Sequence, residues 1–259
     1  MVEATRTGRQ SPLLAVASIC ALATLLVACD RGPALDAPPP RLVESVVAAR
    51  STSPGALPPL LVLLHGLGSN ERDLVGLGSQ LDPRLTVVSV RAPRPYRGGF
   101  AWFGIDWRTD GSLVPNTTQA RVTLADFVHW LGATPARLGT DPRRTYLLGF
   151  SQGAMMSLGV LRTAPERVAG IVALSGKFGE DLFDQAQAPS DAMAGVALFV
   201  AHGTNDDLLP VSDGRAIRDV FQPLIRDFTY REYPISHAIG SDEIDDVAAW
   251  LRERLDRSR

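Results

Sequence analysis

Short apolar segments alternate with longer segments of helical periodicity over most of this 259-residue chain. The near-continuous apolar runs span residues 60–64, 86–90, 145–148, 168–174 and 196–201. The helical patterns span residues 118–138, 152–163 and 212–222. Strands buried on both faces are near-continuous apolar runs, and alternation of such strands with helices is typical of a parallel sheet. The pattern predicts an α/β fold with a mostly parallel, twisted sheet and helices on both faces.

The clearest helix is predicted at the end of the chain. Ser241 is placed to cap it, and Asp242 and Glu243 would interact favourably with the positive end of its dipole. Its apolar stripe consists of Ile244, Val247, Ala248, Leu251 and Leu255. In sheets of this kind, ligands bind beyond the carboxyl ends of the strands, so we expect functional residues directly after each strand.

Composition excludes several classes of protein. With 45% hydrophobic residues the chain can bury a full core, and a net charge of −2 without a basic stripe argues against a nucleic-acid platform. Lys177 is the only lysine, and it lacks the following hydroxyl residue that a phosphate-binding loop requires. We find no internal repeat and no second linker, which predicts a single domain over residues 42–259.

The start of the chain is predicted to be an export signal. Arg6 and Arg9 precede an apolar stretch at 13–28, somewhat shorter than the roughly 20 residues that span a bilayer. The segment ends in Leu-Val-Ala and then Cys29, which resembles the bacterial lipobox, where the cysteine is acylated after cleavage. We therefore expect a lipoprotein signal peptide at 1–28 and lipidation of Cys29. The alternatives are a plain signal peptide or an uncleaved anchor, with Cys29 incidental.

A polar, proline-rich segment follows at residues 29–41 and is expected to act as a semi-rigid tether. A cysteine with several acyl chains binds a membrane stably, so the predicted location is the bacterial cell envelope, lipid-anchored to a membrane and facing the periplasm. Cleavage would also remove Cys20, which leaves the domain without a cysteine pair. A disulfide framework and a cysteine-based zinc site are thereby excluded.

The candidate nucleophile is Ser151. It lies in Gly149-Phe150-Ser151-Gln152-Gly153, directly after a predicted strand and before a predicted helix. This is the G-x-S-x-G elbow in the strand–turn–helix context that the motif requires. The turn would expose the serine at a helix N-terminus, where developing negative charge is stabilised. The alternative is a Gly-Ser turn that only closes a strand.

A serine hydroxyl needs a base, and four histidines are present. In α/β-hydrolases the chain order is serine, acid, histidine, and only His202 and His237 follow Ser151. Choosing His202 would require an acid from residues 180–191, which do not closely follow a strand. We therefore predict His237 as the base. The acid is expected at Asp206 or Asp207, which follow the strand 196–201, and the residues alone do not separate these two.

Acyl transfer also needs N–H donors for the oxyanion. The residue after the nucleophile, Gln152, supplies one, and Leu67, in the glycine-containing loop after the first apolar run, is the expected second donor. A long predicted loop at 94–118 is rich in aromatic residues, and we interpret Trp102 and Phe103 as a wall of an acyl-binding cleft. The alternative is that these aromatics only cover the sheet edge. No cofactor is predicted, and no histidine pair has metal-ligand spacing.

Together these segments resemble the phospholipase/carboxylesterase family, which includes acyl-protein thioesterases. The matching segments are 64–70, 101–103, 149–155, 202–210 and His237 with the helix after it. The resemblance implies a compact α/β-hydrolase without a large lid, and assigns the nucleophile to Ser151, the acid to Asp206 and the base to His237. Ser236, where family members often have glycine, is a departure from the family pattern.

The predicted function is a serine carboxylesterase that hydrolyses esters, and also thioesters or lysophospholipids, through an acyl-enzyme. Its predicted partners are a small acyl ester and the membrane that holds the anchor, with no nucleic acid. Two alternatives remain at this point. One is a polyester or acyl-sugar esterase on the same fold, and the other is an inactive surface-binding lipoprotein.

Overall fold

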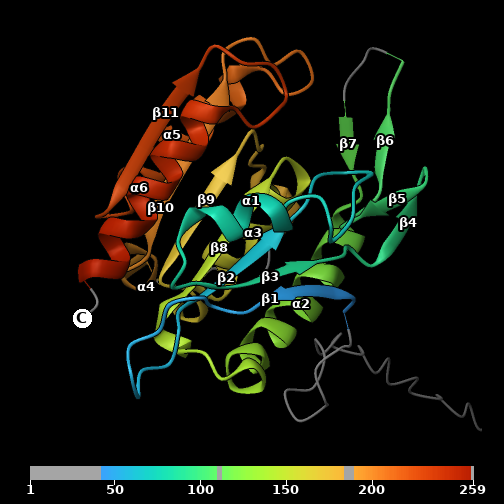
Figure 1. The fold of residues 1–259 in the computed structure, drawn as a ribbon. Coiled ribbons are helices and arrows are strands. Elements are labelled where there is room, and N and C mark those ends of the chain that lie inside the picture. The colour runs from blue at the N-terminus through green and yellow to red at the C-terminus, as the bar shows by residue number, and fades with distance from the viewer. Residues whose placement is uncertain (1–41, 110–112, 184–189, 258–259) are drawn as a thin grey trace, which may run out of the picture. The chain divides into compact units, whose positions relative to one another are not determined.

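The central element of the computed structural model is a seven-stranded sheet (Figure 1). The structure describes residues 42–109, 113–183 and 190–257. The strand order is β1-β3-β2-β8-β9-β10-β11, and β1 runs antiparallel to β3 while the other neighbours are parallel. The bounds are β1 (Glu44–Val47), β2 (Leu60–Leu64), β3 (Thr86–Val90), β8 (Thr145–Phe150), β9 (Gly170–Leu174), β10 (Ala197–Gly203) and β11 (Phe228–Tyr233). The mostly parallel sheet is as predicted.

The apolar runs form the inner strands because both faces of the sheet are covered. Strands β2, β3, β9 and β10 are buried along their whole length. One face packs against α2 (Thr117–Leu138), α3 (Gln152–Thr163) and α5 (Val211–Phe221). The other face packs against α1 (Val75–Leu81) and α6 (Ser241–Arg257). Helices on both faces confirm the predicted architecture.

Two strands extend further toward the site than their apolar runs. Strand β8 continues to Phe150 and β10 continues to Gly203. The polar and glycine residues at these strand ends do not extend the hydrophobic pattern, but their main chains still pair with β9 and β11. Ser151 therefore follows β8 without an intervening loop.

The segment 94–118 is not the irregular loop that we expected. It folds into two small hairpins, β4 (Arg94–Tyr96) with β5 (Gly99–Ala101), and β6 (Ile105–Trp107) with β7 (Leu113–Pro115). Each of these strands is only three residues long, which is too short to display an alternating pattern of polarity. Strand β1, helix α1, helix α4 (Ser190–Ala194) and three short 3-10 helices were also not predicted. The 3-10 helices are η1 (Pro142–Arg144), η2 (Pro165–Arg167) and η3 (Glu180–Phe183).

Helix α6 begins differently from the prediction. Ser241 is its first residue, and the Ser241 hydroxyl bonds the neighbouring Asp242 rather than capping the helix. The Glu243 carboxylate instead reaches back and accepts a 3.2 Å hydrogen bond from the Gly240 N–H. This hydrogen bond is one of the two that form a capping box, the one from the N-cap N–H to the side chain of the third helical residue. It closes the turn between His237 and the helix.

One row of paired residues crosses four strands and shows how far the start of the domain lies from the turn that carries Ser151. Glu44 pairs with Val90, Val90 with Leu64, and Leu64 with Gly149. Because neighbouring strands lie about 4.8 Å apart, Glu44 and Gly149 are separated by roughly 15 Å. Because β1 runs antiparallel to β3, it begins at the carboxyl ends of the parallel strands. Residue 42 therefore lies at the same end of the sheet as Ser151.

Candidate active site

Ser151 occupies a strained turn between β8 and α3. Its backbone has φ 53° and ψ −114°, a conformation that non-glycine residues rarely adopt. Neither flanking glycine has room for a side chain. A Cβ at Gly149 would lie 2.3 Å from the Gly153 carbonyl oxygen, and one at Gly153 would lie 2.0 Å from the Leu64 carbonyl oxygen. The turn holds Ser151 at the N-terminus of α3 with only 7% of the residue exposed.

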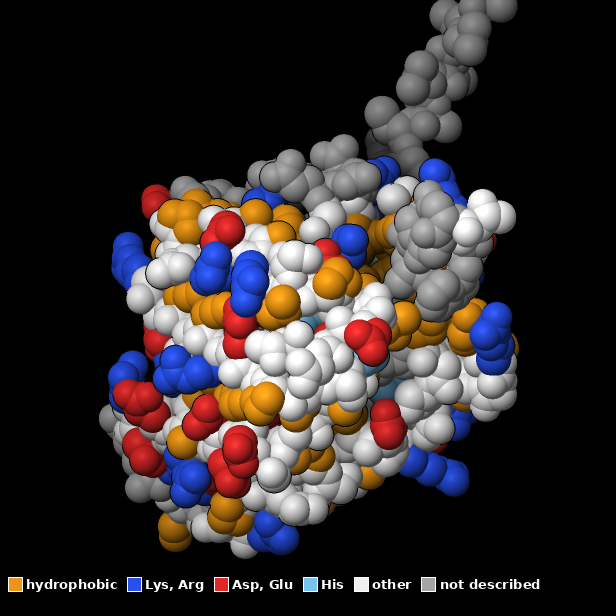
Figure 2. Space-filling view, turned by 90° about the horizontal axis from the view of Figure 1, so that it is seen from above, with side chains coloured by type: hydrophobic (Ala, Val, Ile, Leu, Met, Phe, Trp, Pro, Cys, Tyr) orange, Lys and Arg blue, Asp and Glu red, His pale blue; other side chains and the backbone are white. Residues whose placement is uncertain are grey.

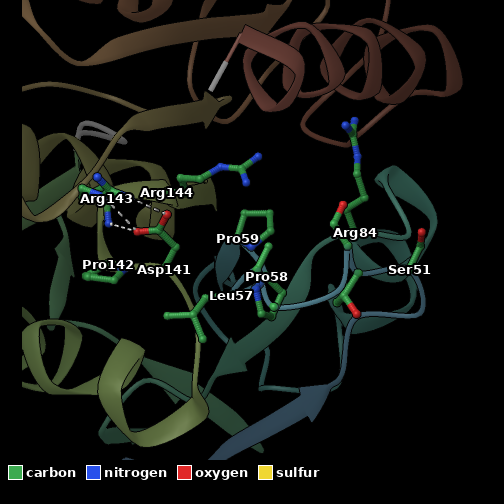
Figure 3. A pocket seen from close by; sticks show the side chains of 13 residues that line it. Ser51, Leu57, Pro58, Pro59, Arg84, Asp141, Pro142, Arg143 and Arg144 are labelled. Carbon is green, nitrogen blue, oxygen red and sulfur yellow. Dashed lines mark hydrogen bonds and ion pairs between the residues drawn. The ribbon is translucent and has the colours of Figure 1, made fainter. Parts of the chain in front are cut away.

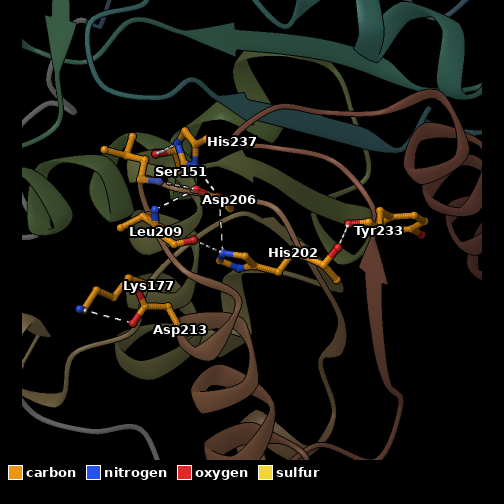
Figure 4. A network of polar contacts seen from close by, with 10 residues as sticks. Ser151, Lys177, His202, Asp206, Leu209, Asp213, Tyr233 and His237 are labelled. Atoms are coloured by element: carbon orange, nitrogen blue, oxygen red, sulfur yellow. Dashed lines mark hydrogen bonds and ion pairs between the residues drawn. The ribbon is translucent and has the colours of Figure 1, made fainter.

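Three side chains from separate segments meet at Ser151 (Figure 4). The Ser151 Oγ lies 2.9 Å from Nε2 of His237, and His237 Nδ1 lies 2.7 Å from Oδ2 of Asp206. His237 follows β11, and Asp206 follows β10. With Nδ1–H donating to the carboxylate, Nε2 is left as the acceptor for the serine hydroxyl proton. The structure thus brings together the three residues that were predicted to form the site.

The structure separates the two adjacent aspartates. Asp206 is 5% exposed, and its Oδ1 accepts hydrogen bonds from the N–H groups of Leu208 at 2.9 Å and Leu209 at 2.8 Å. Asp207 is exposed. The turn at 206–209 therefore orients one carboxylate toward His237, and the main-chain donors satisfy the oxygen that His237 does not use.

His202 lies beneath the carboxylate and not beside the serine. It is completely buried, its Nε2–H donates to the Leu209 carbonyl oxygen at 2.8 Å, and the same nitrogen lies 3.5 Å from Asp206 Oδ2. Its ring packs on Gly214 of α5, where a Cβ would lie 2.7 Å from the ring. His202 therefore stabilises the turn that carries Asp206 by bonding to Leu209. The sequence did not predict this role.

His65 also serves the framework. Its Nε2 accepts a hydrogen bond from the Ala92 N–H at 3.0 Å, so Nδ1 carries the proton and donates to the Gly66 carbonyl oxygen at 2.7 Å. Burial lowers the pKa of His65, which favours this neutral form. The fixed imidazole holds the start of the loop that carries Leu67.

The two predicted oxyanion donors lie on segments adjacent to the nucleophile. A Cβ at Gly66 would lie 3.5 Å from Ser151 Cβ, so the loop of Leu67 passes directly beside the serine. Gln152 opens α3, where the first N–H groups have no intrahelical partner. The loop is held from outside by the Gly68 N–H, which donates to the Phe100 carbonyl oxygen at 2.8 Å.

The aromatic pair is placed differently from the prediction. Trp102 and Phe103 are 0% exposed and pack in the core with helix α2, including Trp102 against Phe127 at 5.7 Å between ring centroids. These side chains support the site from within and do not form the surface of a cleft, which corrects our interpretation of them as a cleft wall. Trp102 Nε1–H also donates to the His65 carbonyl oxygen at 2.9 Å. Cys29 and the side chain of Trp107 lie outside the described part of the chain.

The surface around the site is mixed in character. Figure 2, which views the molecule from above, shows basic, acidic and hydrophobic side chains interspersed, with only small patches of histidine. The His237 side chain is 18% exposed. Within the described ranges, no group of three or more His, Cys, Asp or Glu residues has the geometry of a metal site. The same residues include no helix long and apolar enough to cross a membrane.

A cavity of about 690 Å³ lies at the opposite end of the sheet (Figure 3). Its lining comes from residues 51–53 and 55–59, which precede β2, from Arg84, which precedes β3, and from residues 141–144, which precede β8. It is therefore at the amino ends of the strands, and it contains none of the predicted site residues.

Comparison with known proteins identifies the family. The model of the phospholipase/carboxylesterase family matches residues 46–255. The chain belongs to this family. Family membership confirms the predicted α/β-hydrolase, a serine hydrolase of carboxylic ester bonds with esterase or thioesterase activity.

Individual relatives agree with this assignment. Acyl-protein thioesterase 1 of Saccharomyces cerevisiae is 29% identical over 232 residues, which cover 83% of this chain and 97% of that protein. Acyl-protein thioesterase 1 of Gibberella zeae is 30% identical over 147 residues, or 56% of this chain and 63% of that protein. The crystal structure of esterase PE8 matches with a TM-score of 0.65 and 30% identity, and the match covers 82% of this chain and 99% of that one.

Proposed function

We propose that Ser151 is the nucleophile of this esterase, that His237 is its general base, and that Asp206 orients and stabilises the imidazole. The observation that carries the proposal is the continuous hydrogen-bonded path from Ser151 Oγ through His237 to Asp206 Oδ2. The three residues follow the order that α/β-hydrolases use. The Asp206 side chain is 0% exposed, so solvent weakens its interaction with a charged imidazolium only slightly.

In the acylation step, His237 Nε2 takes the hydroxyl proton as Ser151 Oγ attacks the carbonyl carbon of the ester. The carbonyl π electrons move to oxygen, and the resulting oxyanion accepts hydrogen bonds from the main-chain N–H groups of Leu67 and Gln152. When the tetrahedral intermediate collapses, the C–O bond to the alcohol breaks. His237 then donates its proton to the leaving oxygen, which leaves an acyl group on Ser151.

Deacylation repeats these steps with water as the nucleophile. His237 removes a proton from water, the new C–O bond forms, and Ser151 leaves with the proton returned by the imidazole. The products are a carboxylic acid and the free enzyme. In both steps His237 Nδ1–H keeps its hydrogen bond to Asp206. The protons taken up and released during the reaction are therefore all transferred through Nε2.

For the substrate, we favour small acyl esters and thioesters. The names of the similar proteins support both bond types, since acyl-protein thioesterases and carboxylesterases are among them. Lysophospholipids fit the same chemistry, as do the polyester and acyl-sugar substrates of the alternative proposal. A panel of short-chain, long-chain and aromatic oxygen esters, with matched thioesters, distinguishes these classes by kcat/KM.

The proposal for the N-terminus is a signal peptide at 1–28 and a lipid on Cys29, which would place the enzyme in the cell envelope of a bacterium, on the periplasmic side of a membrane. The basis is the Leu-Val-Ala-Cys sequence and the proline-rich tether. A segment of thirteen residues spans at most about 45 Å. Strand β1, near the start of the described domain, begins at the carboxyl ends of the parallel strands, where Ser151 lies. That position favours acyl esters at the membrane surface as substrates.

The mass of the mature N-terminal peptide tests this part. Lipidation predicts an acylated Cys29 as the first residue, and Cys29→Ala should release the protein from the membrane fraction. An unmodified N-terminus upstream of residue 29 would disprove it without affecting the proposed chemistry.

Labelling with a fluorophosphonate tests the nucleophile. The wild-type protein should be labelled at Ser151 and should hydrolyse a p-nitrophenyl ester, whereas Ser151→Ala should lose labelling and at least about 10⁴-fold in kcat. Folding of the variant is checked by circular dichroism. A wild-type protein that resists the label, or a Ser151→Ala variant that accepts it, would refute the assignment.

A further inference from the structure

The side chain of Gln152 makes two hydrogen bonds that its proposed main-chain role does not require. Its Oε1 accepts from the Trp102 N–H at 2.8 Å, and its Nε2 donates to the Phe103 carbonyl oxygen at 2.7 Å. Gln152 is 1% exposed, and Trp102 and Phe103 are completely buried. Both functional groups of one amide are therefore bonded to the main chain of a single dipeptide, with little access for water to replace either bond.

That dipeptide continues into the segment that holds the Leu67 loop. Two residues earlier, the Phe100 N–H donates to the Ser69 carbonyl oxygen at 2.9 Å, and the Phe100 carbonyl accepts from the Gly68 N–H at 2.8 Å. Gly99 packs so closely on this loop that a Cβ would lie 1.9 Å from the Gly68 carbonyl oxygen. A chain of short main-chain contacts thus connects Leu67 to Trp102.

We propose that the Gln152 side chain is a positioning residue for the oxyanion hole, fixing the loop of Leu67 relative to the elbow through Trp102 and Phe103. The inference rests on the proposed function, in which the N–H groups of Leu67 and Gln152 stabilise the oxyanion. One residue then has two separable roles. Its main-chain N–H is one donor, and its side chain holds the segment that positions the other.

The physical reason is that an oxyanion donor works only at short range. Donors must lie about 2.7–3.1 Å from the place where the negative charge develops, and losing one donor costs about 10²–10³ in kcat. The loop of Leu67 and the elbow belong to segments that are 84 residues apart at Leu67 and Ser151. A rigid connection between them keeps both N–H groups aimed at one point before substrate arrives.

Gln152→Met tests the side chain alone, because methionine keeps the main-chain N–H and a similar length but can make neither amide bond. The matched control is Gln119→Met. Gln119 bonds the same segment, with its Oε1 accepting from the Gly104 N–H at 2.8 Å, but it projects from α2 and not from the elbow. Gln152→Glu is the second variant, which keeps an acceptor for Trp102 and loses the donor to Phe103.

The measurement is kcat and KM for a soluble short-chain p-nitrophenyl ester, per active site counted by fluorophosphonate titration. We expect Gln152→Met to lower kcat about 10–100-fold, with KM changed less than threefold. Gln152→Glu should also lower kcat. The midpoint of the pH profile of kcat should not move in Gln152→Met, since methionine adds no charge and leaves the contacts of His237 and Asp206 untouched. Gln119→Met should stay within twofold of wild type.

Counting sites separates a misaligned oxyanion hole from a loss of folded protein. The inference fails if kcat per titrated site in Gln152→Met is within twofold of wild type, or if Gln119→Met loses as much. If Gln152→Met does not fold, the same criteria apply to Gln152→Glu. A wild-type enzyme that cannot be titrated would instead overturn the proposed function and this inference with it.

Discussion

The two ends of the central sheet are built from different kinds of contact. At the carboxyl ends, Ser151, His202 and Asp206 are at most 7% exposed. Ser151 Oγ bonds His237, Asp206 bonds His237 and two main-chain N–H groups, and His202 Nε2–H donates to the Leu209 carbonyl oxygen. At the amino ends, the 690 Å³ cavity is lined by prolines and arginines, and the Arg143 side chain is 88% exposed. The carboxyl end holds two strained non-glycine residues, Ser151 with φ 53° and Ser175 with φ 47°.

The 690 Å³ cavity therefore contains none of the residues that we propose for the chemistry. Backbone strain costs free energy and persists only where the surrounding structure holds it in place. A buried polar group costs free energy unless it is hydrogen-bonded, so its partners must also be held in place. Both occur at the end where Ser151 and His237 meet. At the other end, the Arg143–Asp141 pair has an arginine side chain that is 88% exposed, and such a pair contributes little to stability. Substitutions at the two ends should therefore differ strongly in their effect.

Among the substitutions that compare the two ends, the largest effect is expected at the acid. Asp206→Asn should lower kcat about 10³–10⁴-fold, because an amide neither fixes the required tautomer of His237 nor stabilises the imidazolium. Asp207→Asn, one residue away and exposed, should stay within threefold of wild type. The measurement is kcat per titrated site on a soluble ester. Equal losses in the two variants would mean that the geometry around Asp206 does not describe the working enzyme.

Glu243 should make stability depend on pH. Burial raises its pKa to about 7 from 4.5, so the folded state prefers the protonated carboxyl. Its stability contribution is complete below about pH 4.5 and is lost as pH rises through about 7. Glu243→Gln should therefore stabilise the protein by up to about 3 kcal/mol at pH 8 and have little effect near pH 4.

Urea denaturation at pH 4.5, 6 and 8 measures this dependence, with Asp242→Asn at the exposed neighbouring position as the control. A Glu243→Gln variant whose stability relative to wild type is the same at all three values would show that this carboxyl does not titrate on unfolding in that range.

Gly214→Ala should destabilise the carboxyl end although alanine is the better helix former. Its Cβ would lie 2.7 Å from the buried His202 ring, which must move and carry the Asp206 turn with it. We expect a loss of about 1–2 kcal/mol in unfolding free energy and roughly tenfold in kcat. Gly76→Ala in α1, with nothing within 4 Å, should be neutral or stabilising. Equal unfolding free energies and equal kcat values in the two variants would show that a side chain at Gly214 does not displace His202.

The smallest effect is expected at the amino-end cavity. Arg143 pairs with Asp141 at 3.4 Å, and its side chain is largely exposed, so Arg143→Ala should change unfolding free energy by less than about 0.5 kcal/mol. Activity should remain within twofold of wild type in the ester assay. A large loss of activity would show that the two ends are coupled and would contradict the comparison.

The fold and the candidate residues Ser151, Asp206 and His237 could be predicted because they depend on short-range sequence patterns. Buried parallel strands have continuous apolar runs, and the G-x-S-x-G motif can be recognised within five residues of Ser151. Chain order then restricted the base to His202 or His237. Short strands escaped detection because β1 and the strands of the two hairpins are only three or four residues long, too short to display a period.

Other features depended on contacts between distant segments. The apolar character of Trp102 and Phe103 was clear, but only packing against α2 decided that they lie inside the core and not on a cleft. The side chain of Gln152 gave no signal, because its partners are main-chain groups about 50 residues away. Main-chain partners carry no sequence signature, so such a connection is visible only in three dimensions.

The sequence by itself determined the alternation of strands and helices, the elbow at Ser151 and the order of the residues that follow it, because each of these is encoded in short-range patterns of polarity and backbone freedom. The residue patterns left Asp206 and Asp207 open and the family resemblance implied Asp206, but only the tertiary structure gives the physical reason. Asp206 bonds His237 because its turn is closed by the Leu208 and Leu209 N–H groups and supported by His202. Residues that are adjacent in sequence differ in role when the fold buries one and exposes the other.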